Sequence, residues 1–284
     1  MLVKKASGEM EKFQPNKIRV TLLRAGASRK LADEIVETVS KKIHEGMTTD
    51  EIMDIACKLL AENDPCSACR YGLKKAIMRL GPTGYPFETF VGELLKKHGY
   101  KVKLRQYARG LCAKHEIDVV ATKPSVDREK RSMIECKYRN TGGQYIELKE
   151  ILITYARFLD LVEGWEKGKG KRFDEAWLIS NAKASQAAKK YAKCREMKLI
   201  CWNYPVNGSL RDIIEQKNLY PITVLRTVDE DAMGRFSDLG IMFLRDLSSK
   251  DMGEMKQATG LSDDKIERIF REAKMILGKK SSNS

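Results

Sequence analysis

Apolar residues recur along the chain with two different periods, and the changes from one period to the other mark its organisation. Over residues 1–81, two short strand-like stretches flank the turn pair Ser7-Gly8, and four segments with apolar positions every three or four residues follow. Thr48 and Glu51 have the spacing of a helix-capping box at the start of the third of these segments. The pattern predicts a β-hairpin followed by four helices, and the polar GPTGYP linker then separates this unit from the rest.

Residues 83–204 switch repeatedly between the strand period and the helix period. Strand-like runs lie at 100–108, 116–121, 132–138, 176–180 and 198–203. Helix-like runs lie at 86–98, 151–163 and 185–197. The resulting order, α-β-β-β-α-β-α-β, predicts a mixed α/β sheet with helices on both of its faces, in an α/β/α core.

The remaining segment, 205–284, has helical periodicity and predicts a separate small helical bundle. Its stretch LSSKDMGEMKQATGLS loosely resembles helix-hairpin-helix modules, which bind the DNA backbone through amide groups at a helix start. The usual G-x-G of that hairpin is absent, so a bundle for packing or dimerisation is the alternative. The sequence therefore predicts three domains, at 1–81, 83–204 and 205–284.

The composition favours an intracellular protein that binds nucleic acid. The formal charge is +14 and the pI is near 9.4, and such an excess attracts polyanions by displacing their counterions. A lysine-rich surface that serves only solubility is the alternative. The chain has no apolar run of the roughly 20 residues that a membrane helix needs, and its N-terminus is charged where a signal peptide would be apolar. We therefore expect a cytoplasmic protein with no membrane partner.

The cysteines and histidines do not predict a metal site. Seven cysteines are an odd number without a regular framework, which favours reduced thiols over disulfides. Cys66 and Cys69 form the only close pair, and the three histidines are isolated, so a structural zinc site is not expected.

Asp118, Glu135 and Lys137 are the candidate catalytic residues. The E-x-K pattern occurs six times in this charged chain, but residues two apart point to the same side only on a strand, and the other copies have helical surroundings. In SMIECKY, Glu135 and Lys137 alternate with apolar residues, and Asp118 is embedded in the apolar run EIDVVA, where an unpaired carboxylate would be unfavourable. An antiparallel pair of strands would bring the three together. Two carboxylates and a cation suit Mg²⁺-assisted phosphodiester hydrolysis, and a surface ion pair is the alternative.

This D…ExK arrangement after an amphipathic helix resembles the PD-(D/E)xK nucleases. The flanking text FETFVGELLKKHGYKV and AWLISNAKASQAAKKYA is most similar to the Mrr-type restriction endonucleases and the archaeal Holliday junction resolvases. The resemblance implies a further active-site carboxylate on the first helix, which falls on Glu88, with Glu93 as the rival one turn later. The family's proline before the aspartate is absent, because Ile117 precedes Asp118. Gln144 would contact substrate or would simply be a polar loop residue.

The N-terminal hairpin and helices resemble the ATP-cone, a nucleotide-binding regulatory module of ribonucleotide reductases and of a transcriptional repressor. The resemblance implies phosphate contacts from Lys5 in the turn and from Lys17 at the first helix. Ala6 and Ser7 stand where the family has arginine and aspartate. ATP or dATP is therefore a candidate effector.

These features together predict a metal-dependent endodeoxyribonuclease. Asp118 and Glu135 would hold Mg²⁺ or Mn²⁺, and Lys137 would orient the attacking water and stabilise the phosphate in the transition state. The tail is nearly neutral, so the basic excess lies in the first two segments, where Lys103 and Arg105 are candidate DNA contacts. We expect a homodimer. The alternatives are a nucleotide-sensing DNA-binding regulator that does not cleave and an RNA-processing nuclease.

Overall fold

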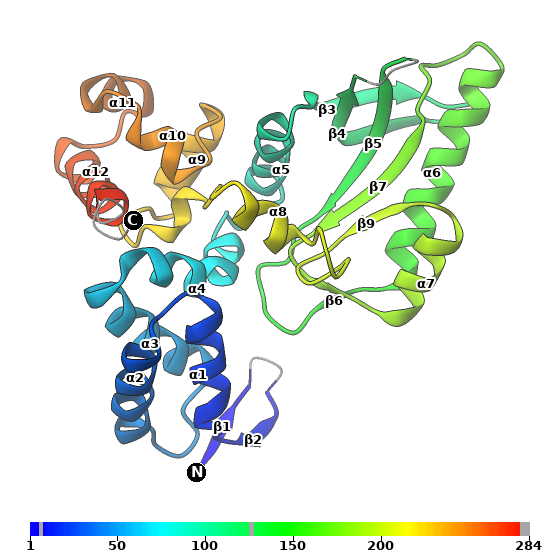
Figure 1. Ribbon diagram of the computed structural model, residues 1–284. Helices are drawn as coiled ribbons and strands as arrows, with labels where there is room; N and C mark the ends of the chain where they lie inside the picture. The colour runs from blue at the N-terminus through cyan, green and yellow to red at the C-terminus, as the bar shows by residue number, and fades with distance from the viewer. Residues whose placement is uncertain (6–7, 125–127, 279–284) are drawn as a thin grey trace.

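The N-terminal unit is the hairpin and four helices that the periodicity predicts. The structure, a computed structural model, describes residues 1–5, 8–124 and 128–278 (Figure 1). The predicted turn at Ser7-Gly8 therefore lies partly outside the described residues. Strands β1 (Leu2–Lys4) and β2 (Met10–Lys12) pair antiparallel. The helices are α1 (Pro15–Arg24), α2 (Arg29–Lys42), α3 (Thr49–Asn63) and α4 (Pro65–Met78).

The middle segment forms a mixed five-stranded sheet in the order β3-β4-β5-β7-β9. Its first three strands are antiparallel and the last three are parallel. The strands are β3 (Lys101–Arg109), β4 (Lys114–Lys123), β5 (Lys130–Lys137), β7 (Glu175–Ser180) and β9 (Lys198–Ile200). Helix α5 (Tyr85–Lys97) covers one face, and helices α6 (Leu148–Glu166) and α7 (Gln186–Cys194) cover the other (Figure 1). The predicted order of helices and strands is confirmed.

Two short strands were not predicted. Strands β6 (Tyr145–Ile146) and β8 (Lys183–Ala184) form a separate parallel pair beside the main sheet. Two residues are too few to show a period, so no pattern in the sequence indicates them.

The C-terminal segment is helical, as predicted. It contains α8 (Leu210–Gln216), the 3₁₀ turn η1 (Ile222–Val224), α9 (Glu230–Asp238), α10 (Leu244–Ser248), α11 (Met252–Thr259) and α12 (Asp263–Gly278). One hydrophobic core runs from the α5 face of the sheet into these helices. Phe90 of α5 meets Phe243 with their ring centroids 5.4 Å apart, so α5 is covered on both sides. None of the helices that the structure describes is long and apolar enough to cross a lipid bilayer.

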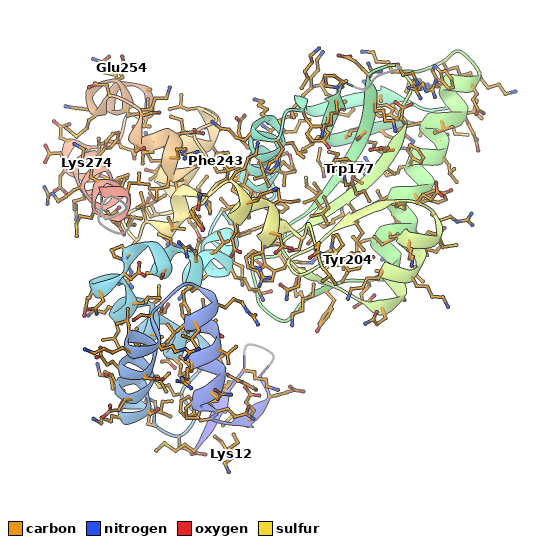
Figure 2. The ribbon with its side chains drawn as sticks, viewed as in Figure 1. Lys12, Trp177, Tyr204, Phe243, Glu254 and Lys274 are labelled. Atoms are coloured by element: carbon orange, nitrogen blue, oxygen red, sulfur yellow. The ribbon has the colours of Figure 1, made fainter. Side chains whose placement is uncertain are left out.

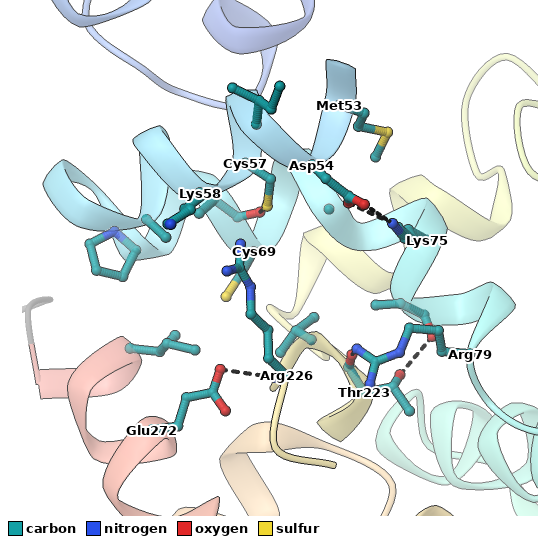
Figure 3. A pocket seen from close by; sticks show the side chains of 18 residues that line it. Met53, Asp54, Cys57, Lys58, Cys69, Lys75, Arg79, Thr223, Arg226 and Glu272 are labelled. Atoms are coloured by element: carbon teal, nitrogen blue, oxygen red, sulfur yellow. Dashed lines mark hydrogen bonds and ion pairs between the residues drawn. The ribbon is translucent and has the colours of Figure 1, made fainter. Parts of the chain in front are cut away.

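The C-terminal end of α4 connects the N-terminal unit to both other segments. The Tyr138 hydroxyl, directly after β5, donates a 2.5 Å hydrogen bond to the Met78 carbonyl. The Arg79 guanidinium donates to the carbonyls of Thr223, Leu225 and Val228. A cavity of about 570 Å³ lies between α3, α4 and the C-terminal helices, and Asp54–Lys75 is an ion pair on its wall (Figure 3).

Candidate active site

Asp118 and Glu135 lie together on neighbouring antiparallel strands. In the register Val119 is opposite Ile134, which brings Asp118 of β4 next to the Glu135–Cys136 stretch of β5. An Asp118 carboxylate oxygen accepts a 2.7 Å hydrogen bond from the Cys136 amide. The strand alternation that the sequence indicates is present, because Ile134 and Cys136 belong to the core under α5 and Glu135 faces away from it.

Glu135 is a buried carboxylate held by two cations. Glu135 is only 5% exposed, and Lys137 Nζ lies 2.7 Å from its Oε1. The other oxygen, Oε2, accepts a hydrogen bond from the Arg157 guanidinium of α6, which also donates to the Glu116 carbonyl. Each Glu135 oxygen therefore has its own cationic partner.

Burial, together with the nearby charge of Glu135, raises the pKa of Asp118 to about 7, although the hydrogen bond from the Cys136 amide lowers it. Two half-desolvated carboxylates that repel each other are suited to a divalent cation with oxygen ligands. Among the described residues no three histidine, cysteine, aspartate or glutamate side chains converge to hold a metal. A cation here would take its further ligands from backbone oxygen, water or substrate phosphate.

Glu88, and not its rival Glu93, faces this site. Glu88 lies in the first turn of α5, where burial raises its pKa, Arg105 lowers it and the charge of Glu135 raises it. Glu93 forms an ion pair with Lys96 and borders Gly240 of the C-terminal helices instead. Of the two glutamates, Glu88 is therefore the one whose charge acts on Asp118 and Glu135.

Arg105 has an unusual backbone for a strand residue. It is flanked by the pairs Leu104–Val119 and Gln106–Ile117, so it lies across from Asp118, and its φ is +49°. The guanidinium reaches Glu88 Oε2 at 3.3 Å and lies 5.6 Å from the centre of the Tyr85 ring.

Lys103 does not share this position. The intervening residue Leu104 packs against Gly92 of α5, which directs Lys103 to the other side of the sheet, where it is exposed. Of the two predicted DNA contacts, only Arg105 lies at the carboxylate cluster.

Arg157 is the residue that the sequence reasoning missed. In the sequence Arg157 is notable only as the single cation among the apolar positions of the predicted helix 151–163. Helical periodicity does not indicate which strand such a side chain will contact. Gln144, in contrast, bonds Thr141 within its own loop, at 2.6 Å.

The two candidate nucleotide contacts lie far from this site, in the N-terminal unit. Lys5 and Lys17 both pair with Glu11, at 3.4 and 3.0 Å. Lys17 also lines a cavity of about 210 Å³ between the hairpin and the helices, with Tyr71 on its wall. Ala6 and Ser7, the two departures from the ATP-cone pattern, lie outside the described residues.

Comparison with known protein families assigns most of the chain. The ATP cone domain matches residues 1–71, the Mrr-type restriction endonuclease domain matches 81–203, and the C-terminal domain of AF1548-like proteins matches 220–277. The chain thus joins an ATP cone to a restriction-endonuclease-like domain, as the sequence resemblances implied.

The same comparison identifies relatives of known sequence or structure. An uncharacterized protein of Archaeoglobus fulgidus is 38% identical over 188 residues, which are 66% of this chain and all of that protein. The crystal structure of AF1548, a protein of unknown function, superposes with a TM-score of 0.61 at 37% identity, covering 70% of this chain and all of that one. The DNA modification-dependent restriction endonuclease AspBHI aligns with a TM-score of 0.39 at 13% identity. The chain belongs to the AF1548-like family.

Proposed function

We propose that this protein is a metal-dependent endodeoxyribonuclease whose active site is formed by Asp118, Glu135 and Lys137, with Glu88 beside them. The observation that carries the proposal is a buried carboxylate, Glu135, and a partly buried one, Asp118, which repel each other next to a lysine inside a restriction endonuclease domain. A purely structural ion pair would not need the second carboxylate, whose ionisation the site opposes.

Each residue has a distinct role in this proposal. Asp118 and Glu135 would hold Mg²⁺ or Mn²⁺, which would supply positive charge to the scissile phosphate. Lys137 orients the attacking water and stabilises the charge that develops on the phosphate. Arg105, beside Glu88, contacts a flanking phosphate of the DNA, and Lys103 adds charge at the sheet surface.

Single substitutions test the assignment. Asp118→Asn, Glu135→Gln and Lys137→Met should each reduce cleavage of labelled DNA by at least 100-fold without loss of folding or of DNA binding, because these groups serve the transition state. Glu93→Gln is the matched control on α5 and should cleave like the parent. Parent activity should require Mg²⁺ or Mn²⁺ and stop with chelator.

The substrates in this assay separate the competing functions. Cleavage of RNA but not DNA would indicate an RNA-processing nuclease. DNA binding without any cleavage would indicate a regulator that retains the fold alone.

We further propose that the ATP cone binds ATP or dATP as an effector, with Lys17 lining its cavity of about 210 Å³ and Lys5 in the hairpin. Calorimetric titration of the full chain should show saturable binding that Lys17→Glu weakens at least tenfold. Lys30→Glu on α2, outside the cavity, is the control. An absence of binding at millimolar nucleotide would reject this proposal and leave the nuclease assignment untouched.

A further inference from the structure

Helix α6 exposes more large apolar side chains than any other helix in the described part of the chain. Leu152, Ile153, Leu159 and Trp165 are 42%, 49%, 39% and 40% exposed, and no other described helix has more than one such residue. The helix lies at the outer edge of the molecule, away from the N-terminal and C-terminal units (Figures 1 and 2). Apolar residues gathered in this way on one helix indicate an interaction surface.

Two of these residues, Leu152 and Leu159, form a regular stripe together with Ala156, while Ile153 and Trp165 lie outside it. Ile151, Thr154 and Leu161 are the buried side of α6. Leu152, Ala156 and Leu159 follow one another at intervals of four and three residues, which is the spacing of a helix that pairs with another helix. Ala156, at the middle, is small and exposed, so a second helix can approach closely there.

Neighbouring elements leave this stripe uncovered. On one side, the turn between β3 and β4 packs against Asp160 and Gly164, where Asp160 accepts hydrogen bonds from the Cys112 and Ala113 amides. On the other side, Tyr155 packs against Tyr191 of α7. The stripe runs between these two contacts.

Two opposite charges lie at the two ends of the stripe, at equal distances from its middle. Lys149 and Glu163 are both exposed, and each lies seven residues from Ala156, about 10 Å along the helix axis. Within the described residues neither forms an ion pair. A surface with a cation at one end, an anion at the other and apolar residues between them is complementary to itself when it is turned around.

We infer that α6 is a homodimer interface, in which two copies pair antiparallel about a twofold axis near Ala156. In this arrangement Lys149 of each copy lies opposite Glu163 of the other, and the leucines at 152 and 159 pack between the two ion pairs. A twofold interface places the same patch on both subunits, as this self-complementary stripe requires. The two ion pairs between the copies oppose the long-range repulsion between two chains of charge +14.

The pairing adds to the proposed nuclease and partly rests on it. Arg157, on another side of the same helix, contacts Glu135, so the helix that pairs also contributes a contact to each active site. Two sites related by a twofold axis match the twofold symmetry of duplex DNA, and each would cut one strand. The dimer itself is measured without DNA or metal, so its failure is distinguishable from failure of the nuclease assignment.

Charge reversal tests the inference by sedimentation velocity of the full chain. The parent should dimerise with a dissociation constant in the micromolar range, since one helix pair is a small interface. Lys149→Glu and Glu163→Lys should each weaken the dimer about tenfold, because two ion pairs become two repulsions. An equimolar mixture of these two variants should recover the parent affinity, since both contacts are then between opposite charges.

A further variant and a control complete the experiment. Leu159→Asp places a charge in the apolar stripe and should leave only monomer. Lys30→Glu and Glu62→Lys, at exposed positions of α2 and α3, should behave as the parent. The inference would be overturned if the parent remains monomeric at 50 μM, about ten times the expected dissociation constant of the dimer. It would also be overturned if the parent dimerises and neither the α6 substitutions nor their mixture changes its dissociation constant.

Discussion

The fold opposes ionisation of the Asp118 carboxyl group, whereas the proposed chemistry requires that group to be ionised. Its pKa of about 7 lies above the usual value of 3.8, because burial and Glu135 disfavour the charged form. The folded protein therefore holds this proton more tightly than the unfolded chain. In chelator, this residue should make the free energy of unfolding fall as the pH rises from about 4 to about 7 and then level off.

Replacing Asp118 with asparagine should remove this pH dependence. The Asp118→Asn variant should be more stable than the parent at pH 8, by up to a few kcal/mol since each pKa unit corresponds to about 1.4 kcal/mol. At pH 4 the two should be nearly equal. Urea unfolding in EDTA at both pH values measures this, and an equal difference at the two would contradict the assigned pKa.

Arg105 should show a conflict between stability and function. A left-handed backbone disfavours residues with a Cβ by roughly 1–2 kcal/mol, whereas glycine adopts it freely but loses more entropy on folding. We expect Arg105→Gly to be more stable than Arg105→Ala by about 1 kcal/mol, and both to bind DNA more weakly than the parent. Denaturant midpoints and DNA titrations measure the two effects. Equal stability of the two variants would show that the φ of +49° carries no strain.

At the residue level, the sequence was informative where alternation determines direction. Asp118, Glu135 and Lys137 could be predicted to lie close together because their strands alternate apolar and charged positions. Arg157 could not, because it approaches Glu135 from a helix that follows β5, and its contact depends on how that helix crosses the sheet. The left-handed Arg105 also has no local signal, because arginine has no preference for that conformation.

At the level of elements, Gly164 shows why one predicted helix boundary was wrong. A glycine after an apolar helix commonly ends it, but α6 continues to Glu166. A Cβ at Gly164 would lie 2.5 Å from the Gly110 carbonyl carbon, so this glycine permits a close approach between α6 and the turn after β3. A sequence pattern cannot distinguish a glycine that ends a helix from one that meets another backbone.

This contact predicts opposite effects for two glycine substitutions. Alanine in an open helical position is favoured over glycine by about 1 kcal/mol, so Gly234→Ala in α9, which has nothing near its added Cβ, should stabilise the protein. Gly164→Ala should destabilise it by roughly 1–3 kcal/mol, because backbone must move to admit the methyl group. Thermal unfolding of both variants measures this, and a gain in stability at 164 would show that the two backbones are not in close contact.

At the level of the whole molecule, the three predicted segments are joined more closely than their periodicity suggests. The linker after residue 81 and the change of pattern near 205 are visible in the sequence, whereas the core that α5 shares with the C-terminal helices is not. Such contacts join residues more than 100 positions apart, and only the folded chain brings them together. The end of α4, with Met78 and Arg79, is where the N-terminal unit meets both other segments.

Tyr138 connects that point to the active site, because it follows Lys137 directly and its hydroxyl bonds the Met78 carbonyl at 2.5 Å. If the ATP cone binds nucleotide as proposed, ordering of α4 should be transmitted through this bond to the end of β5. Hydrogen exchange should then show that ATP protects both the cone, residues 1–78, and the β5 segment 132–138 in the parent. In Tyr138→Phe, which keeps the ring contact with Phe87 and loses the hydroxyl, only the cone should gain protection.

Tyr100→Phe is the control for this experiment, because Tyr100 packs edge-on against Trp177 in the same core and lies away from α4. It should retain the ATP-dependent protection of 132–138. A single neutral hydrogen bond contributes only about 1 kcal/mol to stability, so Tyr138→Phe should remain folded and its exchange pattern interpretable. Protection of β5 that persists in Tyr138→Phe would show that the cone and the nuclease domain communicate by another route, such as the core that α4 shares with α5 or the C-terminal helices that Arg79 contacts.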